Sequence, residues 1–174
     1  MMKYVVFFLL FFSFNLCADE PVHFSTDSVI HLRKNTNNNQ VHYEVRVDES
    51  CRPLKRKPVR AYWLMLEEGI DQTEKIRFWE RPGYGVRQPR TVQWVEGGGN
   101  FEFRIRGVPE RVITLETFST AEGCRARATI MINGERALFE WIEIDVSGWS
   151  NVHRVEIFGR SITSGEAVRE ITYP

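Results

Sequence analysis

The sequence lacks the features that usually mark an enzyme or a nucleic-acid-binding protein. Its 23 basic and 23 acidic residues cancel, so the chain has no overall charge to attract nucleic acid. It has no HExxH spacing and no G-x-S-x-G turn, and its three cysteines form no C-x-x-C pair. It also lacks an internal repeat and a linker long enough to separate domains. These absences favour a single domain without a recognisable catalytic motif.

The longest hydrophobic run lies close to the amino terminus. It covers residues 5–12, follows Lys3, and is succeeded by a polar break and a small residue. This layout is typical of a secretory signal peptide, and the run is too short to cross a bilayer as a helix. We therefore expect residues 1–18 to be a signal peptide and residues 19–174 to be a single β domain, secreted or periplasmic, without a transmembrane segment. Lipid attachment at Cys17 is the alternative.

Without that segment the chain keeps two cysteines, Cys51 and Cys124, and a formal charge of −1, because Lys3 is the only charged residue removed. In an oxidising compartment a pair of cysteines favours a disulfide bond. The bond would close a loop of about 70 residues and contribute on the order of 4 kcal/mol. Two free thiols are the alternative, because the sequence does not show whether the two Cα atoms approach each other.

Apolar and polar residues alternate with period two along most of the chain, which indicates β-strands. The connections are mostly too short for crossover helices, so neighbouring strands are expected to be antiparallel. The pattern predicts an all-β fold, a single antiparallel β-barrel or barrel-like β-sandwich of about nine or ten strands, with at most one short helix at residues 70–80. Pro89 interrupts one run and makes it an edge strand. The predicted strands are residues 28–33, 41–47, 59–66, 86–95, 101–105, 111–118, 126–132, 135–146, 152–158 and 167–172.

Asn133 and Gly134 predict a tight hairpin turn between two of these strands. Both residues tolerate the positive φ that a two-residue type I′ turn requires. The turn also determines which residues face each other across the hairpin. The predicted pairs are Ile132 with Glu135, Ile130 with Ala137, Ala128 with Phe139, Ala126 with Trp141 and Arg127 with Glu140.

The second strand of this hairpin changes phase. Phe139 and Trp141 fit one apolar phase, whereas the isoleucines that follow fit the other. One extra residue, in a β-bulge or a bend that switches sheets at Trp141-Ile142, restores the alternation. The alternative is that Glu143 and Asp145 point into a cavity and contact a ligand. We favour the bend, and expect a ligand on its concave side.

Few side chains are candidates for binding or catalysis. His31 and His42 can lie on one face of the first hairpin, but solvated histidines are more common than a weak metal site, so we expect no metal and no cofactor. Arginine and aromatic residues interleave in residues 78–84 and 94–106, and such surfaces can bind sugars or stacked rings, although core packing explains most aromatic residues of a small β domain. The hypothetical ligand contacts are Trp141, Glu143, Asp145, Tyr62 and Tyr84.

Several short motifs of the mature chain, each different from the others, match the pattern of a known family in their order. The N-x-V-x-Y motif ends at Tyr43, and the other matches are Arg33, Pro58-Val59 before Tyr62-Trp63, Tyr84-Gly85, residues 155–160 (VEIFGR) and Gly165-Glu166. In this order they resemble an uncharacterised, mostly bacterial family, domain of unknown function 4833. Lys34 stands where the family has serine, and Ser164 where it has threonine. The resemblance implies one compact exported β domain and assigns no activity, cofactor or binding residue.

These observations favour an exported protein that binds a small molecule, a glycan or an envelope protein without catalysing a reaction. An envelope hydrolase that uses carboxylates such as Glu143 and Asp145 is the first alternative. A structural or protein-interaction module is the second. A cleft that holds two carboxylates with divergent pKa values would favour the enzyme, whereas a filled interior and an exposed apolar patch would favour the interaction module.

Overall fold

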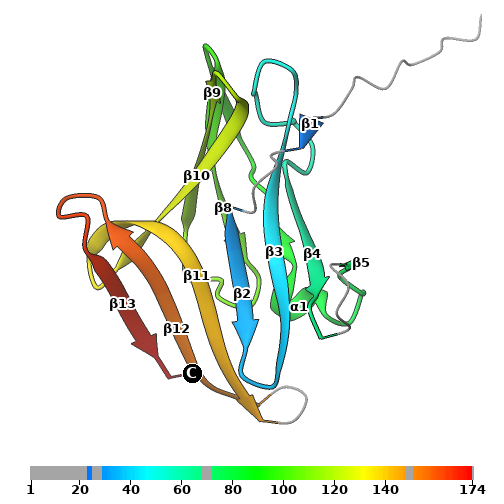
Figure 1. Cartoon of the computed structure of the whole chain (residues 1–174), viewed down its shortest axis with the longest axis vertical. Coiled ribbons are helices and arrows are strands. Elements are labelled where there is room, and N and C mark those ends of the chain that lie inside the picture. Colours follow the sequence, from blue (N-terminus) through cyan, green and yellow to red (C-terminus); the bar gives the residue numbers. More distant parts are fainter. Residues whose placement is uncertain (1–22, 25–28, 68–71, 148–150, 174) are drawn as a thin grey trace, which may run out of the picture.

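The computed structural model describes residues 23–24, 29–67, 72–147 and 151–173, and the predicted signal peptide, residues 1–18, lies outside them. Apart from one four-residue helix, all regular elements of the described chain are strands, so the predicted all-β class is confirmed (Figure 1). The elements are β1 (His23–Phe24), β2 (Ile30–Lys34), β3 (Asn37–Val47), β4 (Val59–Met65), β5 (Gln72–Lys75), α1 (Arg81–Tyr84), β6 (Val86–Arg87), β7 (Val92–Val95), β8 (Gly98–Ile105), β9 (Ile113–Thr120), β10 (Gly123–Ile132), β11 (Glu135–Ser147), β12 (Asn151–Ser161) and β13 (Ala167–Thr172).

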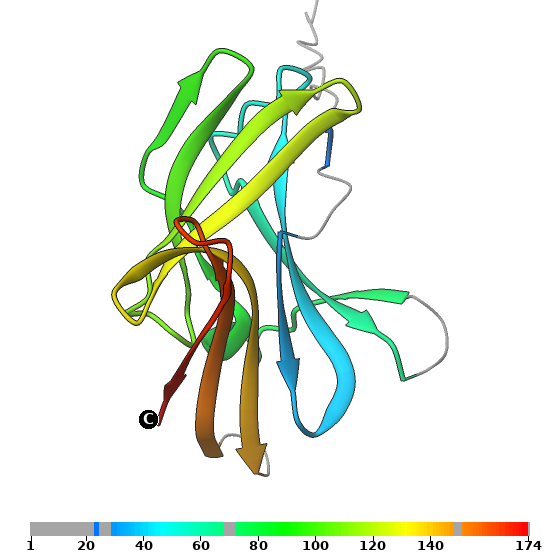
Figure 2. The ribbon, with the colours of Figure 1, turned by 60° about the vertical axis from the view of Figure 1, so that its left-hand side comes forward.

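The strands form a sheet whose main path is β5-β4-β3-β2-β11-β10-β9-β8-β6. β12 and β13 extend from the other edge of β11, and β7 pairs with β8. Figure 2 shows two leaves that diverge from β11, one with β2 to β4 and one with β8 to β10. Among the described residues no ladder joins β5 to β6, so the sheet is open and the predicted barrel is not confirmed.

β11 belongs to both leaves because it changes partner halfway along. Up to Leu138 it pairs with β10, and from Trp141 it pairs with β2 in the parallel direction. A register shift between Phe139 and Trp141 lies one residue before the predicted bend at Trp141-Ile142. The change of phase and of partner is therefore confirmed. The parallel pairing of β2 with β11 corrects the expectation that all neighbouring strands are antiparallel. A short hairpin forces two strands to run antiparallel, but β2 and β11 are far apart in the sequence and are not joined by a hairpin.

The hairpin turn is confirmed close to its tip and corrected farther away. Asn133 and Gly134 have φ values of 49° and 79°. The β10–β11 ladder ends at Thr129 and Leu138. Of the four predicted pairs on the apolar face, two are therefore confirmed and two lie beyond the end of the ladder. Confirmed are Ile132 with Glu135 and Ile130 with Ala137; beyond the end lie Ala128 with Phe139 and Ala126 with Trp141. Arg127 forms its ion pair with Glu116 of β9, at 2.7 Å, and not with Glu140.

The short helix lies later in the chain than predicted. Residues 70 and 71 lie outside the described residues; in the rest of the predicted range the structure has strand β5, and α1 begins at Arg81. β5 adds to the edge of β4, and this pairing overrides a weak helical spacing. Pro82 stands in the first turn of α1, where its missing N–H has no intrahelical partner to lose. In the described part of the chain, no helix is long and apolar enough to cross a membrane.

A disulfide bond between Cys51 and Cys124 is confirmed, with a Cα–Cα distance of 5.2 Å. It links the loop after β3 to the start of β10, and thus joins the two leaves at the upper end of Figure 1. The buried hydroxyl of Thr117 donates a hydrogen bond of 2.7 Å to the carbonyl of Cys51. A bond across 73 residues contributes about 4 kcal/mol by restricting the unfolded chain.

The core lies between the two leaves and is filled by large side chains. Tyr43 of one leaf and Phe103 of the other are each 1 % exposed, and both belong to one hydrophobic cluster. Phe139, predicted as a core aromatic, is 4 % exposed. Ile142 is fully buried, and Glu143, its neighbour on β11, is half-buried on the opposite face of the strand.

Candidate functional site

A cleft of about 860 Å³ opens beside α1, against the inner face of β11 and β12 beyond the bend. We call it the α1 cleft. Its volume lies in the usual range for small-molecule sites. One wall is apolar and comes from both strands and from Val108, in the loop between β8 and β9, while the other is aromatic and charged. The apolar wall includes Val108, Ile144, Val146, Val152 and Val155; the other includes Lys34, Arg77, Trp79, Glu80, Tyr84, Glu110 and Tyr173.

Close backbone contacts hold α1 against the rest of the fold. The N–H of Gly107 donates a hydrogen bond of 2.8 Å to the carbonyl of Gly83. A Cβ atom on Gly107 would lie 2.5 Å from this oxygen, so only glycine fits here. The hydroxyl of Tyr43 donates to the carbonyl of Tyr84 at 3.0 Å. Burial raises the pKa of Tyr43 far above its usual range, so this hydroxyl remains a donor.

The charged groups at the back of the α1 cleft already have partners within the protein. Oε2 of Glu80 accepts hydrogen bonds from the indole N–H of Trp63, at 3.1 Å, and from the backbone N–H of Arg77, at 2.8 Å. The Nζ atom of Lys34 lies 4.8 Å from the ring centre of Trp63 and 4.7 Å from that of Tyr84. These contacts satisfy both charges without a ligand.

Exposed aromatic rings stand at the mouth of the α1 cleft. Trp79 is 51 % exposed and Tyr173 is 74 % exposed. Phe78, also exposed, meets the ring of Trp79 edge to face at 4.9 Å, and the guanidinium of Arg77 lies 5.6 Å from the same ring. Large rings that remain in contact with water at a cleft are typical of binding surfaces.

The opposite face of the same strands carries a row of stacked rings, which we call the aromatic row. Adjacent ring centres along it are 4.7, 6.0, 5.7 and 5.9 Å apart. The strand registers place these residues opposite one another, so the row is a set of cross-strand pairs that stabilises the sheet. In order across β12, β11, β2, β3 and β4 its members are Phe158, Trp141, His31, His42 and Tyr62.

Both histidines of the aromatic row are held in the neutral form. Burial, the charge of Arg33 and the neighbouring His42 lower the pKa of His31 from 6.5 to about 4. Burial and Arg33 also lower the pKa of His42. The two histidines share one face, as predicted, but they are half-buried and stacked instead of solvated. Within the described residues, no three metal-binding side chains are grouped.

The segments that build these features belong to one family. A model described as Domain of unknown function (DUF4833) matches residues 30–171, which include both leaves, α1 and almost all of the α1 cleft. The chain belongs to this family. A search of curated proteins and a search of solved structures found no match. The two departures noted in the sequence lie in this DUF4833 domain at the end of β2, for Lys34, and before β13, for Ser164.

The five predicted ligand contacts of the DUF4833 domain are divided between the two faces of the sheet. Tyr84 lines the α1 cleft, whereas Trp141 and Tyr62 belong to the aromatic row. Glu143 and Asp145 alternate with the residues of the apolar wall, which places them on the outer face.

Asp145 has a structural contact on this face. Its carboxylate accepts a hydrogen bond of 2.6 Å from the side-chain amide of Asn35, whose oxygen accepts one of 3.0 Å from the N–H of Val146. The two bonds fasten the turn after β2 to β11. Glu143 stands opposite Arg33 of β2 and Glu156 of β12.

Sequence reasoning missed most of the α1 cleft. The interleaved segment at residues 78–84 pointed to Trp79 and Tyr84, and both line the cleft. Lys34 and Tyr173 had no signal, because they come from the end of β2 and from the carboxyl-terminal end of the chain, and only the fold brings them together.

Proposed function

We propose that this DUF4833 domain is an exported binding protein without catalytic activity, and that its ligand occupies the α1 cleft. The observation that carries the proposal is the combination of an apolar wall with exposed Trp79 and Tyr173 at the mouth. A small amphipathic ligand fits this arrangement, since one face can pack on the wall while a ring or polar end meets the aromatic rim.

The carboxylates of the α1 cleft favour binding over hydrolysis. Glu80 is occupied by two hydrogen bonds, and Glu110 is exposed beside Arg111, with a 4.0 Å separation. The hydrolase alternative relies on Glu143 and Asp145, and neither lines this cleft. A pair of carboxylates facing each other across a cleft, which hydrolysis of a glycosidic bond needs, is therefore not supported here.

Two independent features support export. The hydrophobic run at residues 5–12 has the layout of a signal peptide. The Cys51–Cys124 disulfide is of the kind that persists in oxidising compartments. Mass spectrometry of the protein purified from its native cells should find an amino terminus close after residue 18. A chain that retains Met1 would contradict cleavage, and a lipid on Cys17 would identify the alternative.

Binding in the α1 cleft can be tested with a neutral amphipathic dye, phenylnaphthylamine, whose fluorescence increases when it leaves water. Trp79→Ala should weaken dye binding about tenfold, as expected for the loss of an aromatic anchor. The matched control is Trp94→Ala, since Trp94 is 43 % exposed and lies outside the cleft. Equal effects of the two substitutions, or no binding to the unaltered domain, would overturn the proposal.

A further inference from the structure

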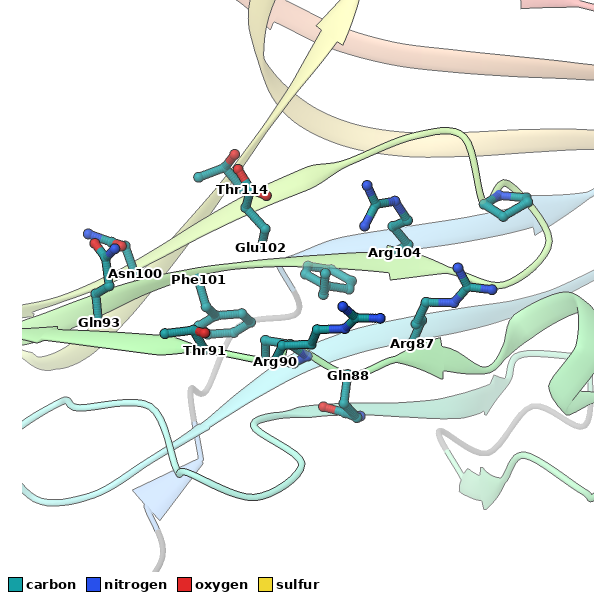
Figure 3. A pocket seen from close by; sticks show the side chains of 13 residues that line it. Arg87, Gln88, Arg90, Thr91, Gln93, Asn100, Phe101, Glu102, Arg104 and Thr114 are labelled. Atoms are coloured by element: carbon teal, nitrogen blue, oxygen red, sulfur yellow. The ribbon is translucent and has the colours of Figure 1, made fainter.

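A second cleft, of about 920 Å³, lies on the outer side of β6, β7 and β8 (Figure 3). It contains three arginines, Arg87, Arg90 and Arg104, and we call it the arginine cleft. Arg87 and Arg104 are directly opposite each other in the β6–β8 pair. Like charges in this position destabilise a sheet, so the fold pays a small electrostatic penalty to hold them there.

The three guanidinium groups are not paired with a carboxylate in the part of the chain that the structure describes. None of them forms an ion pair or a hydrogen bond with a described residue, whereas Arg127 of β10 and Arg169 of β13 each contact a carboxylate at 2.7 Å. Glu102 is the one carboxylate that lines the arginine cleft. In Figure 3 it lies apart from the guanidinium groups, beside Thr114.

The segment that carries two of the arginines is anchored. The side chain of Gln88 donates a hydrogen bond of 2.7 Å to the carbonyl of Val59 and accepts one of 3.3 Å from its N–H. This two-point contact ties the chain between Arg87 and Arg90 to β4. The backbone positions of the arginines are thereby set before any ligand arrives, which lowers the entropy lost on binding.

Uncharged polar groups line the other half of the arginine cleft together with Glu102. Gln93, Asn100 and Thr114 lie together on the side away from the guanidinium groups (Figure 3). The guanidinium group of arginine can donate two parallel hydrogen bonds to two oxygens of a phosphate or sulfate, and it is more weakly hydrated than the ammonium group of lysine. A cleft with a cationic half and a second half that carries amides, a hydroxyl and the carboxylate of Glu102 therefore suits an oxyanion attached to a polar molecule.

We propose that the arginine cleft binds a tetrahedral oxyanion, a phosphate or sulfate group carried on a polar molecule. Arg87 and Arg104 hold the group from two adjacent strands, and Arg90 closes over it from the loop. The amides of Gln93 and Asn100 and the hydroxyl of Thr114 then contact the rest of the ligand. This site is separate from the α1 cleft, with which it shares no lining residue.

The test is calorimetric titration of the disulfide-bonded mature chain with inorganic phosphate and with inorganic sulfate at low ionic strength. Binding of either ion should weaken at least about tenfold in Arg87→Gln/Arg104→Gln, because charged hydrogen bonds are lost, and should weaken as salt is added. The control, Arg56→Gln/Arg81→Gln, changes the net charge equally at exposed arginines outside the cleft and should bind like the unaltered chain.

Two further arms make the result decisive. Vesicles with anionic phosphatidylglycerol distinguish a lipid headgroup from a free ion. If vesicles bind, if binding depends on Arg87 and Arg104, and if phosphate displaces the vesicles, the bound group belongs to a lipid.

Circular dichroism shows whether each variant is folded. Arg87→Lys keeps the positive charge but loses the paired hydrogen bonds of the guanidinium, so it should bind more weakly than the unaltered chain. No binding of any probe, or equal losses in the two double variants, would overturn the proposal. Trp79→Ala should leave phosphate binding unchanged.

Discussion

The α1 cleft and the arginine cleft are similar in size, about 860 and 920 Å³, but their charges are satisfied in opposite ways. In the α1 cleft, Lys34 lies on two aromatic rings and Glu80 accepts two hydrogen bonds. In the arginine cleft, three guanidinium groups have neither kind of partner among the described residues. The first cleft therefore needs no ion to complete it, while the second retains its charge for a ligand.

This difference has an energetic consequence. A charge that the fold satisfies contributes to stability, because its removal leaves a buried donor or acceptor without a partner. An unsatisfied charge contributes nothing to the folded state, so its removal changes affinity and leaves stability almost unaltered. The comparison can thus be tested by measuring the free energy of unfolding alongside ligand binding.

The largest expected effect is common to both clefts, because they share one core. Phe139→Ala should lower the free energy of unfolding by about 3–5 kcal/mol, as the loss of a buried aromatic leaves a cavity. Urea unfolding measures this. Glu143→Ala, on the outer face of the same strand, should change stability by less than about 0.5 kcal/mol. A comparable loss at Glu143 would mean that the faces of β11 are assigned wrongly.

Removing a satisfied charge of the α1 cleft should have the next largest effect. Glu80→Ala leaves the indole N–H of Trp63, a residue 7 % exposed, without its acceptor. We expect a loss of about 1–3 kcal/mol in the free energy of unfolding. Glu110→Ala is the control, because the carboxylate of Glu110 is exposed and its ion pair with Arg111 is long, at 4.0 Å. This substitution should lower the free energy of unfolding by well under half as much as Glu80→Ala. Similar losses would remove the distinction between satisfied and unsatisfied charges.

Acid should loosen the leaf beside the α1 cleft before it affects the arginine cleft. The pKa of His31 falls from 6.5 to about 4 on folding, and that of His42 also falls. Between these values the unfolded chain binds more protons, so stability is fully present above pH 6.5 and decreases as the pH drops toward about 4. Arg33 increases the effect because it is the cation that faces both rings.

Carboxylates titrate in part of the same pH range, so the informative quantity is a difference. His31→Phe/His42→Phe keeps the stacked row and should show a flatter dependence of the unfolding free energy on pH. Hydrogen exchange should show β2 and β3 losing protection in acid earlier than β6 and β8. Identical pH profiles for the variant and the unaltered chain would contradict a role of the two histidines.

The smallest expected effect is the change in the free energy of unfolding when an arginine of the arginine cleft is removed. Arg104→Ala should change the free energy of unfolding by no more than about 0.5 kcal/mol, with any gain coming from relief of the repulsion with Arg87. Arg127→Ala is the paired counterpart, because it breaks an ion pair with Glu116 and should cost about 0.2–1 kcal/mol. Thermal unfolding at low salt resolves the sign. A loss larger than that of Arg127→Ala would mean that Arg104 has a partner within the fold.

Much of the fold follows from patterns confined to a few residues. The period-two alternation identified most of the strands, and Asn133-Gly134 identified its turn because asparagine and glycine tolerate positive φ whatever their tertiary surroundings. The change of phase after Phe139 showed that a bend was needed, although its position was off by one residue. The helix was misplaced because a weak helical spacing in residues 70–80 does not reveal that β4 offers an edge to pair with.

The sites depend on contacts that no local pattern contains. β2 and β11 are parallel neighbours, and this single pairing aligns Trp141 with His31 and so completes the aromatic row. Lys34 approaches Trp63 because β3 pairs with both β2 and β4, and the same contact brings it to Tyr84. Local chemistry was thus enough to predict an all-β chain with a bend close to Trp141, and it left open whether Cys51 and Cys124 pair. The two clefts were decided by the tertiary structure, because each is lined by several separate segments of the sequence. These segments come together only when particular strand edges pair, and that pairing depends on burial of the whole core.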